Sequence, residues 1–500
     1  MAGSARADAL RLSVILIAAA LLLNFGWIGY LASDDAIYVS GGIGWLTQFP
    51  YVGDHHGNVR EPMTMPIALS FALLGQNEFA LVLPTLLAFL GTLAITYFAL
   101  ARRLEPNAGM TAALLVAATP LFAVQSTVAS ADVNELFWLV AAYWLFHTAA
   151  QRPQPSGFLV AAGGAIGLAF LTRETAVFAM VYFGLLFLAG YGLPRSRYWC
   201  MALGFLLVVG AETLYLAAMT GDPLYRINMS MHHGEVNRAL ALEGNVLVHP
   251  LLDPILVFLL NQEFGLLFWI ATPAAIWLCF ARSVEPRWRA VARPLATLGL
   301  VWFACFYAAG ALLPLNPRYG SVATYAAAVL VGLAGLQIAR RARFAAAAMF
   351  AALIGTNLLC LALENREPLF GERALVAYLQ SGAGPVTADP ETRHRASLLL
   401  DWAGVADKAK AGPPLPGERY FYNPYRLAQP TSRRLAGEDL ALYRPAPAWS
   451  AEWSAEGGGR AIGPLLAALR IDRFLPAAVA QKLTGARASV TVYKVGPAGG

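Results

Sequence analysis

The chain has 500 residues, of which 58% are hydrophobic and only 13% are charged. An average soluble protein carries a charge on roughly a quarter of its residues, so this composition excludes an ordinary soluble globular protein. The formal net charge of +6 would suggest nucleic-acid binding in a soluble chain, but here the arginines lie in short clusters between apolar segments. That pattern is typical of the loops of a polytopic membrane protein.

Eleven apolar segments have roughly the length needed to cross a hydrocarbon core of ~30 Å. The first, residues 12–31, follows Arg6 and Arg11 and has no small-residue cleavage site, so we expect a retained helix and not a signal peptide. The other predicted spans are residues 79–100, 109–127, 133–150, 157–171, 175–193, 199–219, 264–281, 295–313, 320–339 and 344–363.

Arginines are distributed unequally between alternate connections of these spans. Clusters such as those in residues 102–103, 195–197 and 340–343 lie in one set of connections, which the positive-inside rule places in the cytoplasm. The opposite set carries isolated arginines and most of the acids and histidines of the membrane half. An odd number of spans then places residues 364–500 on the periplasmic side.

The C-terminal residues differ in character from the rest of the chain. They contain all four lysines, many prolines and alternating short elements. "GPVTAD" and "VTVYKVG" predict strands, whereas "ETRHRASLLLDWAG" has helical spacing. We therefore predict an all-α polytopic membrane domain over residues 1–363, with interfacial helices, and a soluble periplasmic α/β domain over residues 364–500.

Two of the outer loops are long. The loop of residues 33–78 contains "EPMTMPIALSFALLG", an apolar stretch with the size of an interfacial helix and too short to span well. The loop of residues 220–263 contains "NMSMHHGEVNRAL" and a second short apolar run, "PILVFLL". Both loops lie on the side that we assign to the periplasm.

Two adjacent acids, Asp34 and Asp35, follow the first apolar segment in "YLASDDAIYVS". We expect them at the outer, C-terminal end of the first helix, which is the unfavourable pole of the helix dipole for anions. They fit a solvated boundary or the cap of a following helix, and they also fit a functional pair of carboxylates.

Three further charged residues lie at outer helix ends. Asp132 in "STVASADVNEL" fits either a helix N-cap or a functional acid. Arg173 in "FLTRETAVF" and Arg318 in "LPLNPRYGS" interrupt apolar sequence against the positive-inside bias. Because a guanidinium group suits phosphate, the two arginines indicate an anionic ligand near the outer leaflet. The alternatives are snorkelling to lipid headgroups and, for Arg173, a pair with Glu174.

The buried polar residues of the predicted spans are less informative. Glu212 in "VVGAETLYLAAM" falls inside a span, so it is expected to be protonated, paired or facing a wet cavity. The four cysteines lie in apolar segments without metal-ligand or disulfide-like spacing, and we interpret them as small hydrophobic residues.

Two groups of residues with adjacent histidines contain side chains of the types that ligate metal ions. One is Asp54 with His55 and His56, and the other is His232 with His233. No motif with zinc-ligand spacing is present, which favours an interpretation as surface loops. The sequence therefore predicts no certain cofactor and leaves a divalent metal ion open.

The order of these motifs resembles the bacterial branch of glycosyltransferase family 39. The resemblance is carried by "DDAIY" after the first helix, then by "REPMTMPIALSFALLGQNEFALVLP", "SADVNELF", "LTRETA" and "NPRY". It covers roughly residues 10–365, and Met63 stands where many relatives have a second proline. That family has the GT-C membrane fold and includes protein O-mannosyltransferases and lipid A aminoarabinose transferases.

The resemblance implies roles for individual residues. Asp34 and Asp35 would be the catalytic acids, and Arg173 and Arg318 would bind the phosphate of a polyprenyl-phosphate-linked sugar donor. The further substrate-binding positions that it implies are Asp132, Arg60, Glu61 and Tyr38.

The predicted function is an inner-membrane glycosyltransferase that moves one sugar from a polyprenyl phosphate to an acceptor at the periplasmic face. Its expected partners are the lipid-linked donor, membrane lipid and an acceptor protein or glycolipid such as lipid A, with no nucleic acid. The alternative is a polytopic membrane transporter, but transporters usually place their ionisable groups near the bilayer midplane. The unusual charges of this chain concentrate in outer loops and at helix ends.

Overall fold

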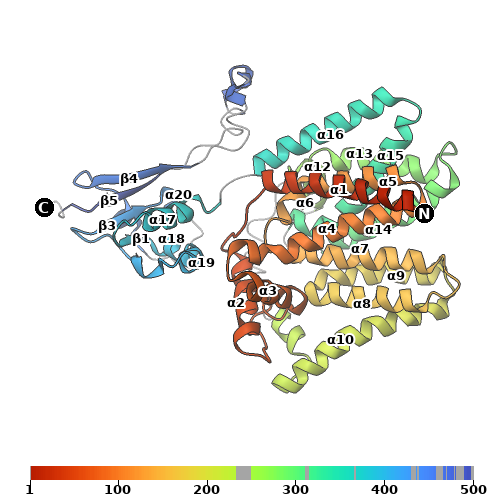
Figure 1. Cartoon of the computed structure of the whole chain (residues 1–500), viewed down its shortest axis with the longest axis horizontal. Helices are drawn as coiled ribbons and strands as arrows, with labels where there is room; N and C mark the ends of the chain where they lie inside the picture. The colour runs from red at the N-terminus through yellow and green to blue at the C-terminus, as the bar shows by residue number, and fades with distance from the viewer. Residues whose placement is uncertain are drawn as a thin grey trace. The chain divides into compact units, whose positions relative to one another are not determined.

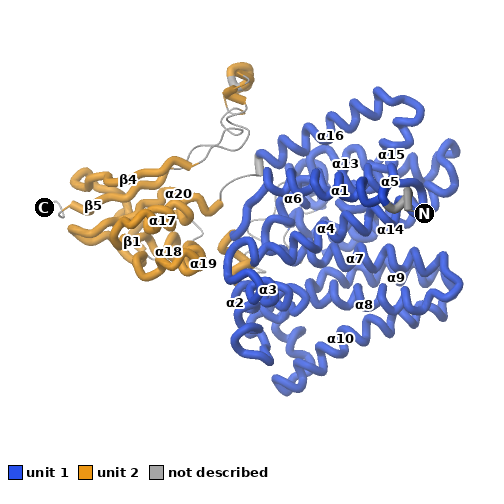
Figure 2. The backbone as a smooth tube through the Cα atoms, viewed as in Figure 1, with its two compact units in different colours: residues 1–30, 37–364 blue, residues 31–36, 365–500 orange. Residues whose placement is uncertain are grey.

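The computed structural model describes residues 2–231, 251–309, 315–364, 368–428, 438–457 and 489–496, together with His249, Leu435 and residues 466–468, 470–477 and 479. The chain forms two compact units, which are coloured separately in Figure 2. Unit 1 comprises residues 1–30 and 37–364, and unit 2 comprises residues 31–36 and 365–500.

Unit 1 is built from helices, and several of the longer ones run side by side (Figure 1). In chain order they are α1 (Ala2–Phe25), α2 (Asp34–Thr47), α3 (Glu61–Leu74), α4 (Glu78–Arg103), α5 (Pro106–Ala117), α6 (Pro120–Gln125), α7 (Ala131–Ala149), α8 (Ser156–Thr172), η1 (Glu174–Ala176), α9 (Val177–Ala189), η2 (Arg195–Arg197), α10 (Tyr198–Thr220), α12 (Asp253–Leu260), α13 (Leu267–Phe280), α14 (Pro286–Ala309), η3 (Pro317–Gly320), α15 (Ser321–Ala339) and α16 (Arg343–Glu364).

All eleven predicted spans fall on helical segments, but residues 109–127 are divided between α5 and α6. The break lies at Thr119, whose backbone is extended because the following residue, Pro120, disfavours the helical conformation at the position before it. Within the described residues, six helices are long and apolar enough to cross a membrane, and five more apolar helices are shorter. The chain is thus a multi-pass membrane protein, while the number of eleven spans stays a prediction.

The prediction for the end of the first helix was wrong. Helix α1 ends at Phe25 and not at Leu31, and it is followed by Gly26 and by Gly29, which has a φ of 77° that favours glycine. Asp34 and Asp35 therefore do not close the first helix. They form the first turn of α2, where the helix dipole stabilises negative charge.

The long outer loops contain short helices. "EPMTMPIALSFALLG" contains α3, which has 14 residues, and all of "PILVFLL" lies in α12. Their placement at the membrane interface remains a prediction. Of the four cysteines, Cys279 and Cys360 are buried and Cys200 and Cys305 are partly buried, and none forms a disulfide.

Helix α15 lies in the core of unit 1 and packs against α5, α13 and α14. Its sequence is rich in alanine and glycine, which lets neighbouring backbones approach closely. A Cβ atom added at Gly332 would lie only 2.9 Å from the Cα of Ala112 in α5. Small residues in α15 thus allow its tight packing against α5.

Unit 2 contains a five-stranded sheet with the order β2-β1-β3-β5-β4. Strands β1 (Val386–Ala388), β2 (Ala409–Ala411) and β3 (Arg419–Tyr422) are parallel, whereas β4 (Ser450–Glu456) and β5 (Ser489–Lys494) pair antiparallel. The helical elements are α17 (Phe370–Gln380), α18 (Pro390–Arg395), α19 (Ser397–Trp402), η4 (Ala406–Lys408), α20 (Pro424–Leu427), η5 (Leu440–Tyr443) and η6 (Ile471–Phe474).

The predicted α/β character of the C-terminal residues is confirmed. "GPVTAD" contains β1, "VTVYKVG" contains most of β5, and the helical stretch between them forms α18 and α19. Leu375 and Leu379 of α17 are fully buried against Val386, Phe421 and Val492 on one face of the sheet. This apolar layer gives unit 2 a hydrophobic core of its own.

Candidate active site

The carboxylate of Asp132 lies at the centre of a cluster of charged side chains in unit 1. It lies in the first turn of α7, is only 3% exposed, and accepts a hydrogen bond from Nη1 of Arg173. Its second carboxylate oxygen lies 3.8 Å from Nε of Arg318. One carboxylate therefore holds two arginines that are far apart in the sequence.

The aromatic ring of Tyr319 is part of the same cluster. The guanidinium carbon of Arg173 lies 4.3 Å from the centre of this ring, and that of Arg318 lies 5.9 Å from it. The electron-rich face of a tyrosine attracts cations, so Tyr319 helps to hold both guanidinium groups. The tyrosine of the "NPRY" motif is a site residue that the sequence analysis did not single out.

Local structure explains why these side chains meet. Arg173 follows the last residue of α8 and has an extended backbone, which turns the chain into η1. Arg318 lies in η3, where the side chain of Asn316 accepts a hydrogen bond from its backbone amide. Both arginines thus sit on short breaks between helices, where a side chain can reach a neighbouring helix end.

The suggested pair between Arg173 and Glu174 does not form. Glu174 instead accepts a hydrogen bond of 3.3 Å from Nη2 of Arg60 and one of 3.1 Å from the hydroxyl group of Ser230. Arg60 also donates to the hydroxyl group of Tyr38, at 2.9 Å. Tyr38, Arg60 and Glu174 therefore form a second chain of polar contacts, which joins α2, the start of α3 and η1.

A third group surrounds Arg226, which is buried. Arg226 donates to Glu61 at 2.5 Å, to Glu212 at 2.6 Å and to the backbone carbonyl groups of Val59 and Leu171. Glu212 is therefore paired, which settles the alternatives that its sequence left open. Burial raises the pKa of Glu61 to about 7, with Arg226 opposing the rise and Glu212 adding to it.

Asp34 and Asp35 differ strongly in their surroundings. Asp35 is 3% exposed and accepts hydrogen bonds from the backbone amides of Leu31 (2.5 Å), Ser33 (2.7 Å) and Ala36 (3.1 Å). These bonds close a turn in which Ala32 has a positive φ of 55°. Burial raises the pKa of Asp35 to about 6, although the three amide bonds lower it. Asp34 is exposed, so it is the carboxylate that can meet a substrate.

The structure thus brings most of the predicted site residues into contact networks of unit 1. Asp132, Arg173 and Arg318 form one network, Tyr38 and Arg60 belong to another, and Glu61 belongs to the third. Asp34 and Asp35 lie in residues 31–36, which group with unit 2, while Tyr38 follows Asp34 by about one helical turn in α2. The residues that the sequence analysis did not place in the site are Glu174, Tyr319 and Arg226, with Glu212 paired to the last.

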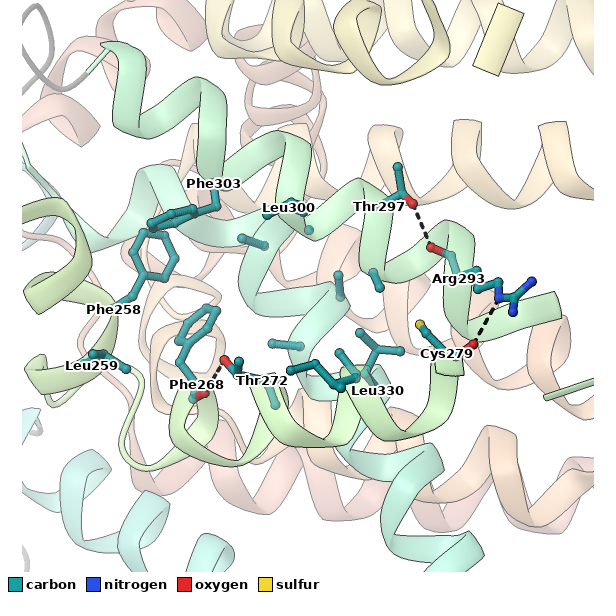
Figure 3. Close-up of a pocket in the computed structure, with 18 of the residues that line it drawn as sticks. Phe258, Leu259, Phe268, Thr272, Cys279, Arg293, Thr297, Leu300, Phe303 and Leu330 are labelled. Carbon is teal, nitrogen blue, oxygen red and sulfur yellow. Dashed lines mark hydrogen bonds between the residues drawn. The ribbon is translucent and has the colours of Figure 1, made fainter. Parts of the chain in front are cut away.

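An apolar cavity of about 690 Å³ lies among the helices next to η3. It is lined by residues of α12, α13, α14 and α15, of which Figure 3 shows Phe258, Phe268 and Phe303 toward one end and Arg293 toward the other. A Cβ atom at Gly320, two residues after Arg318, would lie 2.6 Å from the ring of Phe258. The end of the cavity at Phe258 therefore adjoins η3.

No metal site is found among the described residues, since no three His, Cys, Asp or Glu side chains there are grouped to hold an ion. His55 uses its Nδ1 atom to accept a hydrogen bond of 3.1 Å from the amide of Gly57, and Asp54 accepts one from Asn58. His232 and His233 lie outside the described residues.

Comparison with known proteins places the chain in a fold group. Residues 63–217 match the family described as dolichyl-phosphate-mannose-protein mannosyltransferase, a segment that contains Asp132, Arg173 and Glu212. No curated protein matches the chain.

Solved structures match over most of the chain. ArnT from Cupriavidus metallidurans bound to undecaprenyl phosphate matches with a TM-score of 0.57 and 13% identity, covering 98% of this chain and 99% of that one. The apo state of the same protein gives a TM-score of 0.53 and 12% identity over 89% and 100% of the two chains. The apo oligosaccharyltransferase of Archaeoglobus fulgidus gives 0.51 and 13% identity over 81% and 64%.

The structural similarity to these proteins establishes the fold. The charged side chains of the site lie mostly at helix ends, with Glu212 inside α10 as an exception, which does not favour the transporter alternative. The chain is a membrane glycosyltransferase with the GT-C fold, and its residues 63–217 match the dolichyl-phosphate-mannose-protein mannosyltransferase family.

Proposed function

We propose that the protein moves one sugar from a polyprenyl-phosphate donor to an acceptor at the periplasmic face of the bacterial inner membrane. The observation that carries this proposal is the pair of arginines held by Asp132 next to an apolar cavity. A phosphate joined to a long hydrocarbon chain needs both features, a cationic site and an apolar groove beside it. The undecaprenyl phosphate bound by the structurally similar ArnT supports this ligand class.

The two arginines have different exposures and therefore different roles. The side chain of Arg318 is 31% exposed, so it can contact a donor phosphate directly. The side chain of Arg173 is 8% exposed and is held by Asp132, so it contributes a fixed positive charge behind the phosphate. As the sugar leaves, negative charge develops on the phosphate oxygens, and preorganised cations stabilise it.

The apolar cavity provides room for the first part of the lipid tail. Its walls are dominated by phenylalanine, leucine, isoleucine and alanine side chains, which suit an isoprenoid chain. The cavity extends along α13 from Phe268 to Phe280, about 18 Å at a rise of about 1.5 Å per residue. Because its end at Phe258 adjoins η3, a tail in this cavity leads to a phosphate at Arg318.

Asp34 is the proposed general base. The bond between the anomeric carbon and the phosphate oxygen breaks, a bond from the acceptor oxygen to that carbon forms, and the acceptor proton passes to the Asp34 carboxylate. Polyprenyl phosphate leaves with the electron pair of the broken bond. A positioned carboxylate contributes roughly 10²- to 10⁴-fold to such a step.

The remaining site residues orient the substrates in this proposal. Asp35 fixes the turn before α2 through its three backbone hydrogen bonds and so positions Asp34. Tyr38 and Arg60 offer hydrogen-bonding groups to the sugar, and Glu61 and Asp132 hold the arginines beside them. The acceptor is a protein or a glycolipid such as lipid A, and residues 364–500 lie in the periplasm.

Binding of the lipid carrier tests the donor class. We expect purified protein in detergent to retain undecaprenyl phosphate in native mass spectrometry, and the Arg318→Ala variant to retain much less of it. Arg293→Ala, which removes an arginine toward the other end of the cavity, serves as the control. Equal retention of a neutral polyprenol and of undecaprenyl phosphate would show that the arginines do not bind the phosphate.

A further inference from the structure

Glu135 is a buried acid to which the proposed transfer reaction gives no role. It lies in α7 three residues after Asp132, on the same face of the helix, and it is only 2% exposed. The hydroxyl group of Thr175 donates a hydrogen bond of 2.8 Å to Oε1 of Glu135. Burying a carboxyl group is costly, so its presence at this place calls for an explanation.

The contact of Glu135 fixes the turn that carries Arg173. Arg173 and Thr175 lie on the turn between α8 and α9, and each meets one acid of α7. Arg173 contacts Asp132, and Thr175 contacts Glu135. Two contacts restrict the orientation of this turn more than the ion pair alone would. The position of the Arg173 guanidinium group therefore depends on Glu135 through Thr175.

The start of α7 is a firm base for both contacts. The side-chain amide of Asn134, which lies between the two acids in sequence, donates hydrogen bonds to the hydroxyl group of Thr85 in α4 at 3.0 Å and to the backbone carbonyl of Ser130 at 2.9 Å. Both acceptors are buried. The first turns of α7 are thus tied to α4, and the two acids are presented from a fixed helix end.

The surroundings of Glu135 favour the neutral form of its carboxyl group. Among the described residues, its hydrogen-bond partner is the neutral hydroxyl group of Thr175, and no arginine, lysine or histidine nitrogen lies within 4.0 Å of its carboxyl oxygens. Glu135 also lies beyond the first turn of α7, where the helix dipole no longer stabilises an anion strongly. A buried carboxyl group without a cationic partner binds a proton in preference to staying charged.

A neutral Glu135 leaves excess positive charge at the arginine cluster. The carboxylate of Asp132 offsets one of the two positive charges of Arg173 and Arg318. An ionised Glu135 would offset the other and would leave the cluster without net charge. With Glu135 neutral, one positive charge remains available to an anionic ligand such as a phosphate.

We propose that Glu135 is a neutral positioning residue, which holds the turn of Arg173 through Thr175 without cancelling the charge of the phosphate site. The inference rests on the proposed function, in which Arg173 and Arg318 act on a donor phosphate. Asp132 supplies the counter-charge, whereas Glu135 supplies a hydrogen-bond acceptor. Replacement by the corresponding amide is therefore harmful at Asp132 but harmless at Glu135, because glutamine keeps the acceptor oxygen and has no charge.

Affinity for undecaprenyl phosphate and thermal unfolding, both measured on the full-length protein in detergent, test the proposal. We expect Glu135→Gln to match the wild type in both measurements. Glu135→Ala and Thr175→Val remove the contact from either side, and each should weaken binding by the folded protein about tenfold, because a charge-assisted contact to the phosphate is misplaced. The double variant should bind no more weakly than either single variant, since all three lack the same contact.

Thr172→Val is the matched control. Thr172 is buried next to Arg173 in sequence, but its hydroxyl group donates to the backbone carbonyl of Leu168 within α8. This substitution should leave the affinity unchanged. A purely structural role of Glu135 would lower the unfolding temperature of Glu135→Ala without weakening binding by the folded protein, and that result would overturn the proposal.

The charge state of Glu135 has its own decisive outcome. Tighter binding of undecaprenyl phosphate by Glu135→Gln than by the wild type would show that Glu135 carries a negative charge that opposes the phosphate. If the wild type did not bind undecaprenyl phosphate, the proposed function would fail, and the unfolding temperatures would judge the contact. Equal temperatures for the wild type and Glu135→Gln, with a lower one for Glu135→Ala, would support a neutral contact, and any other order would overturn it.

Discussion

Asp132 at the start of α7 and Arg173 at the end of α8 form a buried ion pair across 41 residues of sequence. The carboxylate accepts from Nη1 of Arg173 with one oxygen and faces Arg318 with the other. A buried charge without a partner is costly, so each member of the pair depends on the other. The pair also fixes the place where a second, more exposed guanidinium group, that of Arg318, can meet an anion.

Removing the carboxylate should therefore destabilise the protein as well as inactivate it. Asp132→Asn leaves Arg173 buried without its counter-charge, and breaking a buried pair typically costs about 3 to 5 kcal/mol. We expect a clear fall in the thermal unfolding temperature in detergent. The control is Glu285→Gln, which removes ion pairs with Arg287 and Arg340 at exposed positions and should cost less than about 1 kcal/mol for each pair. Equal effects of the two substitutions would contradict the central position of Asp132.

The two arginines should give different phenotypes. Arg318→Ala removes a partly exposed side chain, so we expect normal folding and a loss of turnover of about a hundredfold or more. Arg173→Ala should lower both turnover and stability, because it leaves Asp132 buried and without its main partner. Arg173→Lys keeps the charge and should be milder. Turnover with a polyprenyl-phosphate-linked sugar and thermal unfolding, measured together, separate these cases, and normal turnover of folded Arg318→Ala would place the phosphate elsewhere.

Substitutions of the two adjacent aspartates should also differ in their effects on transfer. Asp34→Asn keeps the fold and donor binding but loses transfer, because its exposed carboxylate is the proposed base. Asp35→Asn should be less severe in transfer, since this side chain positions the turn and does not take the proton. Donor binding by native mass spectrometry and product formation check both variants. Near-normal transfer by Asp34→Asn would refute its role as the base for an alcohol acceptor.

The raised pKa of Asp35 predicts a pH dependence of stability. Because its pKa is about 6 in the folded protein and 3.8 otherwise, the folded state binds more protons between these values, and this carboxyl group's contribution to the unfolding free energy falls as the pH rises through that window. The fall between pH 5 and pH 7 is about 1.4 kcal/mol. Unfolding of the wild type and of Asp35→Asn at both pH values measures it. An identical pH dependence in the variant would show that Asp35 does not titrate in this range.

Much of the helical architecture could be predicted from the sequence, because apolar segments bounded by arginines or prolines carry a strong signal. Helix α2 could not be predicted in this way, because its sequence contains Asp34, Asp35 and three glycines and is not an apolar stretch. Without it, the two aspartates were assigned to the wrong end of a helix. The break at Pro120 was missed for a related reason, because hydropathy continues unchanged across it.

Individual residues of the site could be predicted from the sequence, but the ion pairs between them could not. The outer positions of Arg173 and Arg318 followed from the positive-inside bias. Their common partner, Asp132, could not be predicted in this way. It lies 41 residues from Arg173 in sequence, and only the packing of α7 against α8 brings the two together. Glu174, the nearest acid in sequence, lies beyond the extended backbone of Arg173 and pairs with Arg60. The partners of Glu212 were equally out of reach, since Arg226 follows it after the end of α10.

The most direct test of the account is turnover of a radiolabelled polyprenyl-phosphate-linked sugar by the purified wild-type protein. Membrane extracts that contain both glycoproteins and glycolipids supply the acceptor, and Asp34→Asn is measured alongside. We predict that the wild type releases polyprenyl phosphate and labels an acceptor, and that folded Asp34→Asn binds the donor without labelling any acceptor. Folded wild type that binds the donor but neither releases polyprenyl phosphate nor labels any acceptor fraction would contradict it.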